Sequence, residues 1–332
     1  MRRYAIPAIA LLFLLFATLM AQPYPQPTPQ PIARGIGQPP RVQSQQYVLT
    51  VTIIGTGTVA KSPDKAKYTS NIDVTLTATA GAGWVFSGWS GDASGSTNPL
   101  TVTMTAAKSI TATFAFEGVL FAGAQTITLG DADALDGTGT RTYDAWLRVP
   151  ATTGVSTIKV FWSKLTAANP FANILLEQQY DSLRVLVSGA GVPQIIQDGF
   201  FVANTWVHFR LVMDGTKLWL YKDVALQNGG GTNYTVGAAN NIAMWFGYWD
   251  FTTDRYWVGD IACPRVWSTV HTTDDRATLY AAGTTGLLAQ WSQVTGSTYT
   301  DITGSFNGTL GSAAAAPTVT TWTGLTTSGP TP

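Results

Sequence analysis

The chain has 332 residues, 11% of them charged, with 19 Lys and Arg balancing 19 Asp and Glu. This length allows two domains of ordinary size, and so few charges together with 12 Trp and 33 Gly are typical of an exported all-β protein rather than of disorder or a coiled coil. The zero net charge argues against nucleic-acid binding, which needs a clustered cationic surface.

Residues 1–21 have the pattern of an export signal. Arg2 and Arg3 precede an apolar run over residues 5–20, and Ala21 offers a small residue for cleavage. The run contains a proline and is shorter than the roughly 20 residues of a spanning helix. We therefore expect cleavage after Ala21 and no membrane insertion of the mature chain, with an uncleaved anchor as the alternative.

Cys263 is the only cysteine, so no intrachain disulfide can form. Because extracellular eukaryotic proteins of this size usually have several disulfides, we expect a bacterial or archaeal protein that is secreted or displayed on the cell surface. Cys263 itself is expected to be a small apolar core residue on a strand.

Residues 22–46 form a Pro-rich linker that we expect to be extended, in the polyproline II conformation. A recognition motif for a partner is the alternative, because proline spacing alone is nonspecific.

Residues 47–116 are predicted to form a small all-β module. Alternating apolar and polar residues predict its strands at 47–53, 73–79, 100–104 and 109–114. Trp84, Phe86 and Trp89 lie between these strands, and we expect them in the core, because so small a module needs large buried side chains. An exposed aromatic contact patch is the alternative.

Three segments of this module carry a resemblance to a known family: Gly55-Thr-Gly-Thr-Val59, Trp84-Val-Phe-Ser-Gly-Trp-Ser-Gly91 and Ile110-Thr-Ala-Thr-Phe114. The module resembles the divergent internalin-B-type repeat of bacterial surface proteins. The resemblance implies a β-grasp-like fold and a role as a spacer or adhesive unit.

Residues 117–322 are predicted to form a second, larger β domain. Its short strands and Gly-rich turns favour an antiparallel two-sheet jelly roll, with strands at 119–123, 142–148, 161–164, 174–178, 183–188, 242–247 and 255–261. A hairpin is predicted around Asp214-Gly215, because apolar residues alternate on both sides of a dipeptide that suits a type I′ turn. Val207, Phe209, Leu211 and Met213 should share its buried face.

The hairpin segment Trp206–Asp223 and the segment Val258–Trp267 resemble the laminin-G-like branch of the concanavalin-A-like jelly rolls. The resemblance implies a short helix over residues 272–280. Residues 287–310 resemble an element that precedes the first strand in this family, but here they come last. Whether residues 287–322 close this sandwich or begin a truncated further unit is open, and residues 323–332 are expected to be a frayed polar tail.

The best binding candidate is the loop between two predicted strands of the second domain. A sugar site needs a flat aromatic face together with carboxylate or Arg groups for the hydroxyls. The loop supplies these groups in Tyr248, Trp249, Asp250, Asp254 and Arg255. A tight hairpin whose aromatic residues shield the end of the sandwich is the competing interpretation, with Trp245 and Trp257 in the core in either case.

Catalytic sites find little support in the sequence. The retaining glucanases of the concanavalin-like fold need two carboxylates about 5–5.5 Å apart, but the only Glu residues are Glu117 and Glu177. Asp131 and Asp133 are expected in a turn, and Asp274-Asp275 at the start of the short helix. No catalytic residue is predicted.

The two histidines and the single cysteine do not have the spacing of a zinc site. His208 is expected to be a packing residue in a strand, and His271 a solvated surface residue. No cofactor is predicted, although Asp131, Asp133 or Asp250 could bind Ca²⁺ at a loop edge, since hard cations prefer oxygen ligands.

Together these features predict an exported, non-catalytic surface protein. Its sandwich would bind a glycan or another envelope or extracellular ligand at rim loops, with the small module as a spacer. Two alternatives remain: a structural or adhesive module that binds other proteins, and a polysaccharide-active enzyme of the same fold.

Overall fold

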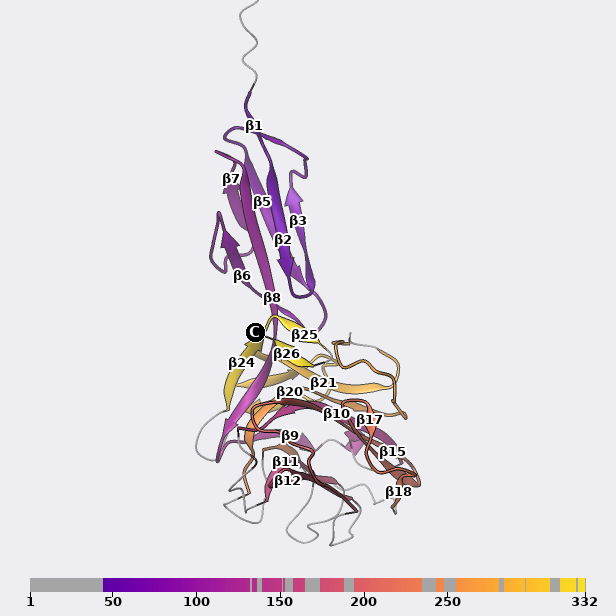
Figure 1. The fold of residues 1–332 in the computed structure, drawn as a ribbon. Helices are drawn as coiled ribbons and strands as arrows, with labels where there is room; N and C mark the ends of the chain where they lie inside the picture. Colours follow the sequence, from indigo (N-terminus) through magenta and orange to yellow (C-terminus); the bar gives the residue numbers. More distant parts are fainter. Residues whose placement is uncertain are drawn as a thin grey trace, which may run out of the picture. The chain divides into compact units, whose positions relative to one another are not determined.

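The computed structural model describes residues 44–331 apart from 132, 136–138, 151, 153–157, 165–173, 188–193, 235–242, 248–254, 281–283, 296, 311–316 and 327. The described part contains many strands and no α-helix, so the predicted all-β class is confirmed. Residues 46–332 group as one compact unit (Figure 1). The export signal and most of the Pro-rich linker lie outside the described residues. Within the described part, no helix has the length and apolar character to cross a membrane.

The small module consists of two three-stranded sheets, in the orders β2–β8–β6 and β3–β5–β7, and a short β1–β4 ladder. The strands are β1 (Gln46–Tyr47), β2 (Leu49–Ile54), β3 (Gly57–Ser62), β4 (Tyr68–Thr69), β5 (Asp73–Ala80), β6 (Val85–Gly91), β7 (Leu100–Thr103) and β8 (Lys108–Ala122). Trp84 and Trp89 are buried and Phe86 is half-buried against the same core. The prediction that the two tryptophans are core residues is confirmed.

The larger domain is a sandwich whose first sheet has the order β24–β8–β20–β10–β15–β16. Strand β8 therefore pairs in both the small module and the sandwich. The new strands are β10 (Thr140–Arg148), β15 (Trp206–Asp214), β16 (Lys217–Lys222), β20 (Val258–Trp267) and β24 (Thr318–Trp322). The short strands β17 (Ala225–Leu226) and β18 (Thr232–Asn233) both pair with β16.

The second sheet has the order β14–β13–β12–β11–β19–β9–β23–β22. Its strands are β9 (Ile127–Asp131), β11 (Lys159–Lys164), β12 (Ile174–Gln179), β13 (Ser182–Val187), β14 (Ile195–Gln197), β19 (Ala243–Phe246), β22 (Thr298–Asp301) and β23 (Gly308–Leu310). A 3₁₀ turn, η1 (Asp133–Leu135), follows β9. Strand β21 (Leu287–Thr295) pairs with β20 of the first sheet and with β22 of the second.

The core fills the space between the two sheets. Alternate residues of each strand point inward, so the first sheet contributes Val207, Phe209, Leu211 and Met213 from β15, all buried as predicted. Trp162 from the second sheet packs edge-on against Tyr143 from the first, with ring centroids 5.5 Å apart.

The predicted hairpin forms, but its turn differs from the type I′ expected. Met213 pairs with Leu218, and Gly215 has a φ of 95° while Asp214 and Thr216 keep negative values. A type I′ turn needs positive φ at both central residues. Instead, the Asp214 carboxylate stabilises this turn. Its Oδ1 accepts hydrogen bonds from the backbone N–H groups of Thr216 and Lys217 at 2.8 and 2.6 Å.

The C-terminal residues belong to this sandwich. Strands β21, β22 and β23 connect β20 to β9, and β24 pairs with β8. Residues 287–322 therefore close the sandwich rather than begin another unit. The expected frayed tail instead forms a hairpin of β25 (Gly324–Thr326) and β26 (Gly329–Thr331), with Gly329 against the ring of Trp206.

The short helix expected over residues 272–280 is absent. The segment contains one turn, in which the N–H of Thr278 donates to Asp275 O at 2.9 Å. Instead, its side chains and carbonyl groups form hydrogen bonds with buried groups of the first sheet.

Candidate functional site

Four of the five predicted ligand-binding residues, Tyr248, Trp249, Asp250 and Asp254, lie outside the described residues. The two ends of their loop are described, and both lie beside β11. Gly247 N–H donates to Phe161 O at 3.2 Å, and Val160 N–H donates to Arg255 O at 3.0 Å. Arg255, the fifth predicted residue, therefore lies beside Val160 of β11 in the second sheet.

The second sheet has an outer face that points away from the core. Directly opposed residues on neighbouring strands share a face, and the register pairs Val160 with Glu177, Glu177 with Arg184, and Arg184 with Ile196. The same face carries further residues in register: Ser163, Leu175, Gln179, Ser182, Leu186 and Trp245. Trp245, expected in the core, is only half-buried on this face.

Glu177 is the central charged group of the outer face. Its side chain is 2% exposed, and its Oε1 lies 3.2 Å from Nη1 of Arg184. Burial raises the pKa of Glu177, and the charges of Arg184 and Arg255 offset part of this rise. Arg255, predicted as a site residue, is thus brought together with a carboxylate that was considered only as a catalytic residue. The sequence signal for this carboxylate was a Glu at the end of the apolar run Ile174-Leu-Leu-Glu177.

A second charged cluster covers the outer face of the first sheet. Asp144 on β10 is fully buried between Arg210 on β15 and Arg265 on β20, with distances of 3.0 Å to Arg210 Nη2 and 2.6 Å to Arg265 Nε. Burial alone would raise the pKa of Asp144, but the two guanidinium charges hold it below its usual value. Because its charges pair with one another, this cluster links the three strands β10, β15 and β20.

Asp275 ties the 268–280 segment to this cluster. It pairs with Arg210, and it receives a hydrogen bond from Tyr280 Oη at 2.5 Å. His271 Nε2 lies 2.6 Å from Asp275 Oδ2, and the His271 ring stacks on Trp267 at 4.0 Å. His271 was expected to be solvated and Asp275 to begin a helix. Both predictions are wrong, because these side chains bury the arginines of the sheet.

The surroundings of Cys263 and His208 indicate packing roles for both residues. Burial raises the pKa of the Cys263 thiol to about 12, and Cys263 is a core residue on β20 as predicted. His208 is buried and packs edge-on against Trp146 at 5.1 Å, but its Nε2 has no hydrogen-bond partner. The side chains of Asp131 and Asp133 lie outside the described part. Among the side chains that are described, no group of three His, Cys, Asp or Glu residues could hold a metal ion.

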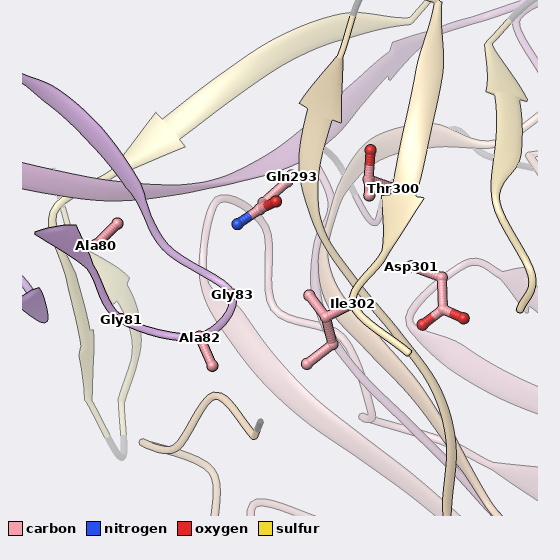
Figure 2. A pocket seen from close by; sticks show the side chains of 8 residues that line it. All are labelled: Ala80, Gly81, Ala82, Gly83, Gln293, Thr300, Asp301 and Ile302. Atoms are coloured by element: carbon pink, nitrogen blue, oxygen red, sulfur yellow. The ribbon is translucent and has the colours of Figure 1, made fainter. Parts of the chain in front are cut away.

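A pocket of about 340 Å³ lies where the turn after β5 meets β21 and β22. Figure 2 shows Gln293 and Ile302 facing the turn Ala80–Gly83, whereas Asp301 points away from it. The Asp301 carboxylate is taken up by internal hydrogen bonds, including those from the N–H groups of Gln290 and Thr303. The pocket therefore offers neutral amide, hydroxyl and small apolar groups.

Comparisons with known families agree with both resemblances in the sequence. Residues 47–117 match the divergent InlB B-repeat domain, and residues 121–277 match the concanavalin A-like lectin/glucanases superfamily. A comparison with curated proteins gives no match.

Solved structures with a similar fold include a putative carbohydrate binding protein from Bacteroides ovatus ATCC 8483. It is 13% identical, with a TM-score of 0.50, and the match covers 83% of this chain and 97% of that chain. The CBM40 of Ruminococcus gnavus IT-sialidase, bound to α2,3 sialyllactose, is 13% identical over 48% of this chain and 94% of that chain, with a TM-score of 0.37. The SAP-like pentraxin of Limulus polyphemus is 14% identical over 47% of this chain and 78% of that chain, at a TM-score of 0.35. The Bacteroides ovatus structure, with its TM-score of 0.50, shows a shared fold.

Proposed function

We propose that this chain is an exported, non-catalytic protein whose sandwich binds carbohydrate, with the small module as a spacer. The observation that carries the proposal is the outer face of the second sheet. There Glu177, Arg184 and Arg255 gather, and Arg255 directly follows the aromatic segment 248–254 in the sequence. The fold shared with a putative carbohydrate binding protein over most of both chains supports it.

The chemistry of this face suits sugar recognition. Carboxylate and guanidinium groups bind hydroxyls in directed hydrogen bonds, and aromatic faces contact the C–H groups of a pyranose ring. Arg255 adjoins Val160 in the strand next to Glu177. Tyr248, Trp249, Asp250 and Asp254 would complete the site from the adjoining loop.

A binding role fits this face better than glycoside hydrolysis. Retaining glycosidases need two carboxylates about 5–5.5 Å apart. Among the described residues, the charges that act on Glu177 are those of Arg184 and Arg255. The other Glu residue, Glu117, lies on β8, where its Oε2 accepts the N–H of Val294. Release of reducing ends from a glucan, lost in Asp131→Ala, would instead support an enzyme.

The test is a glycan array probed with the full chain as secreted. Its N-terminus would also be sequenced, and export with cleavage after Ala21 predicts that it begins at Gln22. The variant Trp249→Ala/Asp254→Ala should lose glycan retention, whereas Ile72→Ala, an exposed residue of the small module, should retain it. Unchanged retention by the double variant would contradict the sugar site. A parallel array with EDTA tests whether calcium is required.

A protein-binding role is the second candidate, and strand β2, an edge strand among the described strands of the small module, favours it. Strand β2 pairs with β8 on one side, and its residues Ile53 and Ile54 are 42% and 44% exposed. An exposed strand edge with apolar residues can pair with another chain. If the array showed no glycan and Ile54→Lys abolished adhesion of the full chain to a host or envelope extract, this function would replace the first.

A further inference from the structure

Glu177 and Arg184 leave one hydrogen-bond acceptor and one donor unmatched on the outer face of the second sheet. Arg184 Nη1 is engaged by Glu177 Oε1 at 3.2 Å and by Gln179 Oε1 at 3.3 Å. Glu177 Oε2 and Arg184 Nε are buried and have no hydrogen-bond partner. Buried polar groups are nearly always paired, so this adjacent pair marks a place for a further polar group.

The two unmatched atoms select among ligand groups. A sugar hydroxyl accepts one hydrogen bond and donates another. It can therefore accept a hydrogen bond from the Arg184 N–H and donate one to the Glu177 carboxylate. A ligand carboxylate could accept from Arg184 but would be repelled by the Glu177 oxygen. An ammonium group could serve Glu177 but would leave the Arg184 N–H unmatched.

The two unmatched atoms are buried, but exposed side chains lie beside the pair, at β14 and at the β12–β13 turn. The Arg184 side chain is 16% exposed. Its cross-strand neighbour Ile196 is 58% exposed, and Tyr180, at the tip of the turn beside Gln179, is 50% exposed. An aromatic ring and an aliphatic side chain next to a donor and an acceptor are the inventory for a sugar ring.

We propose that Glu177 and Arg184 form a hydroxyl-binding subsite for a neutral sugar, with Tyr180 and Ile196 contacting its apolar face. This inference rests on the proposed carbohydrate-binding function and names its ligand class and the residues that read it. Neutral glycans should therefore be preferred over glycans rich in uronic or sialic acid.

The experiment measures the affinity of the full chain for neutral glucans, mannans and galactans and for polygalacturonate and sialylated oligosaccharides. Glu177→Gln should weaken neutral-glycan binding about tenfold, because a hydrogen bond to a charged acceptor is lost. Tyr180→Ala, an exposed substitution that does not threaten folding, should weaken it as well. Asp260→Asn is the matched control, since Asp260 also pairs with an arginine, Arg148, and has a buried oxygen without a partner, but on the first sheet.

The outcomes separate the two proposals. Loss of neutral-glycan affinity in Glu177→Gln and Tyr180→Ala, with Asp260→Asn unchanged, supports the subsite. Glycan binding that depends on Trp249 but not on Glu177 or Tyr180 overturns the subsite and leaves the proposed function standing, as does a preference for acidic glycans. If Glu177→Gln fails to fold, Tyr180→Ala decides. No binding by the wild type overturns both.

Discussion

Asp275 is a single residue on which the 268–280 segment depends. It is 6% exposed and pairs with Arg210, His271 and Tyr280. Asp275→Asn is expected to lower the free energy of unfolding by about 3–5 kcal/mol, because a broken buried ion pair leaves a charge without compensation. Asp274→Asn is the matched control, with a side chain 45% exposed and a pair to Arg276, and should change stability by less than about 1 kcal/mol. Equal effects in urea denaturation would contradict this role.

His208 makes stability depend on pH. Burial lowers its pKa to about 3, whereas an unfolded histidine titrates near 6.5. Between these pH values the unfolded state binds a proton that the folded state does not. The free energy of unfolding is therefore not lowered by this histidine above about pH 6.5, and it falls as the pH decreases from 6.5 toward 3. His208→Gln should flatten that decline, by at most about 1.4 kcal/mol per pH unit. Urea denaturation from pH 7 to pH 4 measures it, and parallel curves for variant and wild type would rule it out.

The β15–β16 hairpin depends on the backbone freedom of one glycine. Gly215 has a φ of 95° with open space around it, so its substitution is a matter of strain and not of collision. Gly215→Ala should destabilise the protein by about 1–2 kcal/mol, because L-residues resist the left-handed region. Gly230→Ala, at a glycine with equal space and no positive φ, should leave stability nearly unchanged. Thermal unfolding of the two variants compares them, and equal losses would show that the turn tolerates a side chain.

Elements whose pattern is local were predictable from the sequence, and elements decided by distant partners were not. Alternation along Trp206–Asp214 predicts which face packs into the sandwich core, since the side-chain period of a strand is two. The helix expected over residues 272–280 has two acidic residues in its first turn, Asp274 and Asp275, but Asp275 pairs with Arg210, 65 residues away in sequence. No local pattern reveals such a contact, so the helix predicted there was wrong.

The candidate site was predictable in the same partial way. The sequence placed aromatic and charged residues in one loop, and the structure brings Arg255 of that loop to the charged pair on the second sheet. That Glu177 faces Arg184 follows from the register of β12 and β13. A one-residue shift in that register would have turned Glu177 toward the core, and composition alone does not fix it.

At the scale of the whole molecule, the small module and the sandwich share a strand and an aromatic cluster. Strand β8 pairs with β2 and β6 through its first half and with β20 and β24 through its second. Phe116, near the middle of β8, packs against Trp84 at 5.2 Å and against Trp322 at 5.8 Å. A strand that belongs to two sheets cannot detach from one without loosening the other.

We therefore expect residues 46–332 to unfold in one cooperative transition by calorimetry. Trp322→Ala should lower stability by about 3–5 kcal/mol, because Trp322 is 6% exposed and its removal leaves a cavity against Phe116 and Trp206. Val319→Ala, at a 39% exposed position on the same strand, is the control and should have little effect. Because Phe116 also supports Trp84, the Trp322→Ala transition should shift to lower temperature as a whole. Two resolved transitions in the wild type, or a shift in only one of two, would show that the modules are energetically independent.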